Sequence, residues 1–162
     1  MLRLDNRQVL LAALTPPAGY AFDCGICTTY LLDLPTLLVA PLSLTLLDVA
    51  SVDSALRDPV LLLEGLQRHA EQLTVFCQAG QIAIPAADSY LFRFLEGMVV
   101  QVQAPYGGVF HPKVWLLRYT AADQPVLYRF LCMTRNMTLD RSWDILLRLD
   151  GQVVKRNQAG RI

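Results

Sequence analysis

The sequence predicts an α/β fold in which helices flank a mixed β-sheet. Expected helices and strands alternate through the first hundred residues, two strands joined by a polar turn follow, and no repeat or low-complexity linker interrupts the pattern. Of the 162 residues, 54% are hydrophobic and 17% are charged, which is enough apolar material for a sizeable core. We therefore expect one domain over residues 1–162.

Each expected element rests on a local pattern. The first strand follows a Pro- and Gly-rich entry and alternates in side-chain type, and the Asp58-Pro59 pair is typical of a helix start. Strands are expected at 20–31, 73–77, 99–104, 113–119, 126–132 and 145–149, the last closed by Asp150 and Gly151, with a short segment at 82–85. Helices are expected at 37–49, 59–71 and 86–98, the last with one apolar face that could cover the sheet.

Charge and hydropathy narrow the classes of function. Fourteen basic residues balance fourteen acidic ones, which argues against a protein that coats nucleic acid indiscriminately. The basic residues nevertheless gather after Lys113, so an anionic ligand is expected in the C-terminal third. The N-terminus has no apolar core of the kind a secretory signal needs, and the apolar segment 34–47 is short and interrupted by prolines. We expect a cytoplasmic protein without a transmembrane segment, in which 34–47 is a buried helix or helical pair.

The cysteines lie at positions 24, 27, 77 and 132 and include one Cys-x-x-Cys pair. A structural zinc site would need two further ligands at compatible spacing, and no second pair exists. Redox and metal roles are alternatives, but small buried side chains in strands are the favoured interpretation. We expect neither a metal nor a cofactor.

The segment Phe110-His111-Pro112-Lys113 carries the most informative chemistry. Residues i and i+2 of a strand point to the same face, so the imidazole and the ammonium are expected to share a site at the start of a strand. Thr134 and Asn136 follow the end of the paired strand and would add hydroxyl and amide donors. Such donors stabilise the charge of a phosphoryl group without a metal, while an imidazole can attack phosphorus or protonate a leaving oxygen.

This pattern resembles the signature of the phospholipase D superfamily, which is His-x-Lys, a gap, and Gly-Ser-x-Asn, often with a downstream Ser and acidic residue. The match here is His111-Pro112-Lys113, then Met133-Thr134-Arg135-Asn136, then Ser142 and Asp144. Met133 replaces the usual Gly, Arg118 stands where Asp is frequent, and the gap is longer than usual.

The resemblance implies an α/β sandwich of the phospholipase D type and a role for each matched residue. It makes His111 a nucleophile or acid, Lys113 and Asn136 phosphate ligands, Thr134 the equivalent of the family serine and Asp144 a possible orienter of a histidine. Arg135 and Arg141 are candidates for contacts to a nucleic-acid backbone, although solvated loop charge is an equal alternative. Trp115 and Trp143 are expected to pack in the protein, with base stacking as the less favoured role.

The family's site requires two His-x-Lys sets, and this chain has one. The other histidine, His69, is followed two positions later by Glu71 and is expected at the surface or at a helix end, where a cation suits the helix dipole. The second set would come from a symmetric partner or from the other half of a longer, two-motif enzyme.

We therefore expect a metal-independent phosphodiesterase, of the nuclease type, that acts through a phosphohistidine. A non-catalytic nucleic-acid-binding or assembly subunit is the alternative of another class. Phospholipid hydrolysis is a further alternative, which would require the segment 34–47 to be exposed.

Overall fold

The computed structural model describes residues 10–45, 59–83, 85, 90–138 and 144–153. In chain order its elements are α1 (Leu10–Leu14), β1 (Ala21–Thr29), β2 (Leu32–Asp33), α2 (Leu34–Thr45), α4 (Pro59–His69), β3 (Leu73–Gln78), β4 (Ile82–Ala83), the 3₁₀ helix η2 (Tyr90–Met98), β5 (Val99–Val102), the 3₁₀ helix η3 (Pro105–Gly107), β6 (Val114–Ala121), β7 (Gln124–Met133) and β8 (Leu146–Gln152). The expected elements are thus present, with the bounds of several shifted by a few residues.

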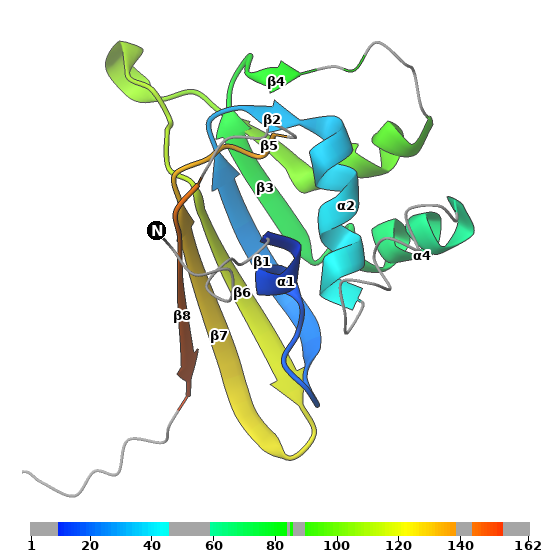
Figure 1. Ribbon diagram of the computed structural model, residues 1–162. Coiled ribbons are helices and arrows are strands. Elements are labelled where there is room, and N and C mark those ends of the chain that lie inside the picture. Colours follow the sequence, from blue (N-terminus) through cyan, green and yellow to red (C-terminus); the bar gives the residue numbers. More distant parts are fainter. Residues whose placement is uncertain (1–9, 46–58, 84, 86–89, 139–143, 154–162) are drawn as a thin grey trace, which may run out of the picture.

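Six strands form one mixed sheet in the order β5-β3-β1-β6-β7-β8, and β2 pairs with β4 beside it (Figure 1). β1 runs parallel to β3 and β3 runs parallel to β5, whereas β6, β7 and β8 pair antiparallel in succession from β1. These directions bring the carboxyl ends of β1, β3, β5 and β7 to the same edge as the beginnings of β6 and β8. The prediction of a mixed α/β fold is confirmed.

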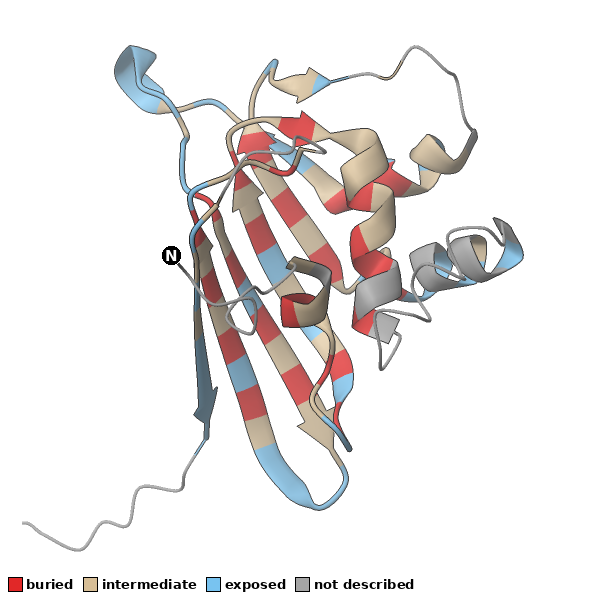
Figure 2. Cartoon of the chain, in the orientation of Figure 1, coloured by how far each residue is buried: buried red, intermediate tan, exposed pale blue. Residues whose placement is uncertain are grey.

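Helices α1 and α2 pack against one face of the sheet, and Figure 1 shows α1 in front of the strands. Side chains on that face of the strands, such as Trp115 and Leu117, are fully buried, and Leu37 and Leu44 of α2 are buried above them. Figure 2 shows the resulting alternation of buried and open positions along the central strands. Within the described chain, no helix is long and apolar enough to cross a membrane.

The opposite face of the sheet carries apolar side chains that remain partly open to solvent. One row runs across four strands, because Ile26 of β1 pairs with Leu116 of β6, which pairs with Phe130 of β7, which pairs with Leu149 of β8. Three of these four residues are 41–56% exposed. In the described chain the sheet therefore has one helix-covered face and one open apolar face.

Two expectations about individual elements were wrong. The described part of the helix expected at 86–98 is the 3₁₀ helix η2, which buries Leu95 and Met98 three residues apart, as its threefold period allows. The last strand does not close at Asp150 and Gly151 but continues to Gln152. Its pairing with β7 extends to Gln152, which pairs with Leu127, and the carboxylate of Asp150 contacts the guanidinium of Arg129.

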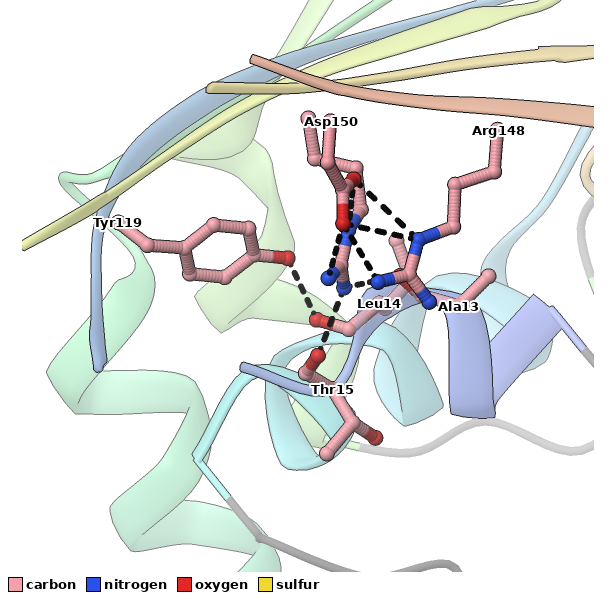
Figure 3. Close-up of polar contacts among 7 residues, drawn as sticks. Ala13, Leu14, Thr15, Tyr119, Arg148 and Asp150 are labelled. Atoms are coloured by element: carbon pink, nitrogen blue, oxygen red, sulfur yellow. Dashed lines mark hydrogen bonds and ion pairs between the residues drawn. The ribbon is translucent and has the colours of Figure 1, made fainter. Parts of the chain in front are cut away.

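Arg129 is a buried charge whose contacts link three elements. Figure 3 labels four residues that it contacts, which are Ala13, Thr15, Tyr119 and Asp150. Its side chain is 1% exposed, and its Nε lies 2.8 Å from Oδ1 of Asp150. Its Nη1 donates to the carbonyl oxygens of Ala13 and Thr15, 2.8 Å from each, and its guanidinium lies 5.1 Å from the ring centre of Tyr119. One side chain of β7 thereby joins β8 and the end of α1.

Both acidic groups beside Arg129 titrate abnormally. The pKa of Asp150 falls to about 2, because hydrogen bonds from Arg129 and Arg148 outweigh the opposing effect of burial. Burial raises the pKa of Tyr119 to about 12, and its hydroxyl donates to the carbonyl oxygen of Leu14 at 2.8 Å. The folded protein thus keeps Asp150 ionised and Tyr119 neutral across the ordinary pH range.

Replacing Asp150 tests this cluster. Asp150→Asn leaves the Arg129 charge buried without its counter-ion, and we expect the free energy of unfolding at pH 7 to fall by about 2–4 kcal/mol. The folded pKa lies below the unfolded one, so the contribution is present above about pH 4 and disappears as the pH falls toward 2.

Urea unfolding from pH 7 to pH 2 would measure the difference between wild type and variant. Asp123→Asn, in the exposed turn between β6 and β7, is the matched control and should be neutral. A difference for Asp150→Asn that is independent of pH would contradict the role of its ionised carboxylate.

Candidate active site

His111 and Lys113 lie just before β6, at the edge where the strand ends gather. The strand begins at Val114, so the two residues stand in the segment that leads into it rather than in the strand itself. Nζ of Lys113 nevertheless lies 3.0 Å from Nδ1 and 3.1 Å from Nε2 of His111, and 3.3 Å from the His111 carbonyl oxygen. The predicted pairing of ammonium and imidazole is present.

The two side chains differ in their exposure. Lys113 is 8% exposed, and its burial lowers the pKa of the ammonium, whereas His111 is open to solvent. A poorly hydrated cation gains more from an anionic ligand than a hydrated one, because water screens it less. An anion that reaches the exposed imidazole would therefore meet a cation already held beside it.

Side chains from two neighbouring strands position this segment. The ring of Tyr30, next to the end of β1, lies 5.0 Å from the His111 ring, centre to centre. Oε1 of Gln78, at the end of β3, accepts a hydrogen bond of 2.7 Å from the backbone N–H of Phe110. The segment that contains His111 is thus positioned by residues at the carboxyl ends of two parallel strands.

The end of β1 also holds the second motif segment. Thr28 Oγ1 accepts from the N–H of Val114 at 3.0 Å, and Thr29 Oγ1 accepts from the N–H of Met137 at 3.0 Å. The N–H of Leu31 donates to Oδ1 of Asn136 at 3.4 Å. The side-chain amide nitrogen of Asn136 therefore points away from Leu31. Residues 28–31 therefore join the His-x-Lys segment to the segment that contains Asn136.

Thr134 and Asp144 contact each other. Oδ1 of Asp144 accepts from the backbone N–H of Thr134 at 3.0 Å and from its hydroxyl, which in turn accepts from the N–H of Ile145 at 3.0 Å. The expected role of Asp144 as an orienter of a histidine is thus not the contact that the structure shows. The pair therefore links the residue that follows β7 to the residues that precede β8.

The remaining sequence candidates have separate outcomes. Arg135 donates to the carbonyl oxygen of Thr138, within the loop that follows β7. Trp115 is fully buried, so the prediction that it packs in the core is confirmed. Arg141, Ser142 and Trp143 lie outside the described residues.

His69 does not have the surroundings expected of it. It ends α4, as predicted, but is 4% exposed and packs edge-on against Phe22 with ring centres 5.1 Å apart. Burial lowers its pKa, which opposes the cationic role expected at a helix end. Its Nδ1 lies 2.7 Å from Oε1 of Gln72. Because its side chain is buried and has a polar partner, His69 is a residue of the core.

The cysteines lie in strands and are free thiols. Cys27 and Cys77 are buried as expected, whereas Cys132 is partly exposed and Cys24 is exposed, which corrects the expectation for that residue. Among the described residues no three His, Cys, Asp or Glu side chains gather as a metal site would require.

The His-x-Lys motif thus lies at the strand ends of a mixed α/β sheet. No family model and no curated protein matches the sequence. Among solved structures, the fold is similar to yeast tyrosyl-DNA phosphodiesterase over 79% of this chain and 24% of that one, with 14% identity and a TM-score of 0.45. It is also similar to polyphosphate kinase from Porphyromonas gingivalis over 82% of this chain and 18% of that one, with 17% identity and a TM-score of 0.36.

The chain spans about a quarter or less of the length of these two proteins.

Several residues of the site carry no sequence signal of their own. Thr28, Thr29, Tyr30 and Gln78 belong to ordinary strand patterns, and their relation to the motif arises from the pairing of β1 with β3 and β6. Their position at strand ends could have indicated a role in the site, because ligands of open α/β sheets bind outside the carboxyl ends of the strands.

Removal of the Thr29 hydroxyl tests the link between the two motif segments. Thr29→Val keeps the shape of the side chain but leaves the buried N–H of Met137 without its acceptor. We expect the free energy of unfolding to fall by about 1–2 kcal/mol and amide exchange at Met137 to accelerate. Thr29→Ser, which keeps the hydroxyl, should retain slow exchange; equal exchange in both variants would contradict the link.

Asp144→Asn tests whether the Asp144 carboxylate forms a hydrogen bond with Thr134 or orients a histidine. We expect faster amide exchange at Thr134 and Ile145 and a loss of about 1 kcal/mol in unfolding free energy, since a charge-assisted hydrogen bond becomes a neutral one. The NMR signals of the His111 ring nitrogens should be the same in wild type and variant. Changed His111 ring signals with unchanged exchange at Thr134 would restore the role first expected.

Proposed function

We propose that this chain carries one half of a metal-independent phosphodiesterase site and acts as a nuclease in the cytoplasm. The observation that carries the proposal is the buried Lys113 ammonium within 3.1 Å of both ring nitrogens of the exposed His111. A cation and a nucleophile held together at a sheet edge suit the attack of nitrogen on a phosphodiester.

In the proposed reaction the unprotonated nitrogen of His111 attacks phosphorus and the bond to the leaving oxygen breaks. Lys113 and the amide nitrogen of Asn136 stabilise the charge on the non-bridging oxygens. The histidine of a second His-x-Lys set protonates the leaving oxygen and then accepts a proton from the water that cleaves the phosphorus–nitrogen bond. That second set comes from a partner copy or from another half of a longer chain.

Nucleic acid is the favoured substrate class. Arg135 and Arg141 lie in the segment that follows β7, and the C-terminal third is the basic part of the sequence. The lipid alternative required an exposed segment 34–47, whereas Leu37, Ala40 and Leu44 of α2 are buried. Phospholipid is therefore the less favoured substrate.

A non-catalytic binding or assembly subunit is the second candidate. The hydroxyl of Thr134, which would act as the family serine, is bonded to Asp144, and Met133 fills the glycine position with a buried side chain. These two departures concern only the Thr134 side of the motif.

His111→Ala decides between catalysis and scaffolding. We expect cleavage of DNA or RNA oligonucleotides, measured with chelator present, to fall by at least about 1000-fold because the nucleophile is lost. The control His69→Asn should lower stability but leave the cleavage rate of folded protein unchanged. Cleavage that persists in His111→Ala, or that requires a divalent metal, would overturn the mechanism.

A subunit-mixing experiment tests where the second set comes from. If two copies share one site, an equal mixture of wild type and His111→Ala re-equilibrated as dimers retains about a quarter of the activity, because both histidines are needed. Independent sites would retain half. Retention of half the activity, or activity of a strict monomer, would show that the second set does not come from a copy of this chain.

A further inference from the structure

The segment between β5 and β6 presents an aromatic ring that folding does not use. It contains η3, a single turn with no buried residue, and Figure 1 shows this turn projecting away from the body of the molecule. Tyr106 in this turn is 104% exposed and Val109 is 62% exposed. Figure 2 shows the turn as exposed. A large apolar side chain in this position contributes no buried area to stability.

The backbone at Tyr106 is also unfavourable. Its φ of 57° and ψ of 31° lie in the left-handed region, which residues other than glycine, asparagine and aspartate rarely adopt. The following Gly107 has a φ of 73°, where glycine is suited. A strained tyrosine that packs against nothing is poorly explained by folding, and backbone strain of this kind is concentrated at functional sites.

Hydrogen bonds at both ends hold the projecting turn in place. The N–H of Gly108 donates to the carbonyl oxygen of Pro105 at 3.1 Å and closes the turn. On the β5 side Oε1 of Gln101 accepts from the N–H of Gly80 at 3.0 Å, and on the other side Phe110 is bonded to Gln78. The segment that carries the ring is therefore anchored at both ends, and His111 follows Tyr106 by five residues at the same edge of the sheet.

We propose that Tyr106 is a stacking platform for an unpaired base of a nucleic-acid strand whose phosphodiester lies at His111. This inference rests on the proposed function and adds the form of the substrate, a single strand or an unpaired end. Both faces of the ring are open, as stacking requires, and every base offers a flat face. The stretch 103–110 carries no Lys or Arg, so phosphate contacts do not explain its exposure.

A membrane surface is the competing ligand for an exposed aromatic. Anchoring to a bilayer interface draws on a larger apolar face and on cationic residues that attract anionic lipids. The turn offers one tyrosine and one valine without a cation. These features favour a base over a lipid.

Binding measured without turnover tests the platform. The full protein is titrated against a fluorescent single-stranded oligonucleotide, the same strand with abasic sites around its centre, and the corresponding duplex. We expect Tyr106→Ala to weaken single-strand binding by about 10- to 100-fold, in line with the loss of one stacked base. Abasic and duplex binding should not change, and Tyr106→Phe and Tyr106→Trp should bind as wild type does.

Two controls keep the result interpretable. Val109→Ala, in the same segment, should leave binding unchanged, and Tyr106→Gly should raise the unfolding temperature because it removes the backbone strain while losing the ring. His111→Ala should bind the strand but not cleave it, so a failure of the catalytic proposal is seen separately from a failure of the platform.

The proposal is overturned if Tyr106→Ala binds the single strand as tightly as wild type, or loses abasic strand equally. It is also overturned if wild type binds none of the oligonucleotides, or if the variant loses binding to phosphatidylcholine–phosphatidylserine vesicles instead.

Discussion

The end of β1 is the constraint on which the candidate site depends. A ladder of backbone hydrogen bonds stops where a strand ends, and buried N–H groups beyond it need other acceptors. Thr28 and Thr29 supply these acceptors, one to the segment that follows His111 and one to the segment that follows Asn136. Because the two hydroxyls point to opposite faces of one strand, they hold two loops that are more than twenty residues apart in sequence.

The strand directions turn this local arrangement into a site. β1, β3 and β5 run one way and β6 runs the other, so loops that leave three strands meet the loop that enters a fourth. The imidazole of His111 stands at this meeting point between Tyr30 and Lys113. Away from this edge, the buried Arg129 links β7 to β8 and to the end of α1.

The two buried cations Arg129 and Lys113 differ in the groups that surround them. Arg129 is neutralised by Asp150 and by two carbonyl oxygens, so its charge is satisfied within the fold. Lys113 is almost as inaccessible, yet the group that it contacts is an imidazole rather than a carboxylate. A satisfied buried charge stabilises structure, whereas the Lys113 ammonium, for which the described residues supply no carboxylate partner, is prepared for an anionic ligand.

The sequence by itself determined the alternation of helices and strands, the pairing of His111 with Lys113, and the packing role of Trp115, because periodicity and spacing are local properties. The tertiary structure decided that Asp144 bonds to Thr134, that His69 is a core residue, and that β8 runs on past Asp150. It also decided that Thr28, Thr29, Tyr30 and Gln78 belong to the site. These outcomes depend on which strands become neighbours and on which polar groups lose contact with water. The residues nearby in sequence do not determine either of these, because both depend on segments that are distant in sequence.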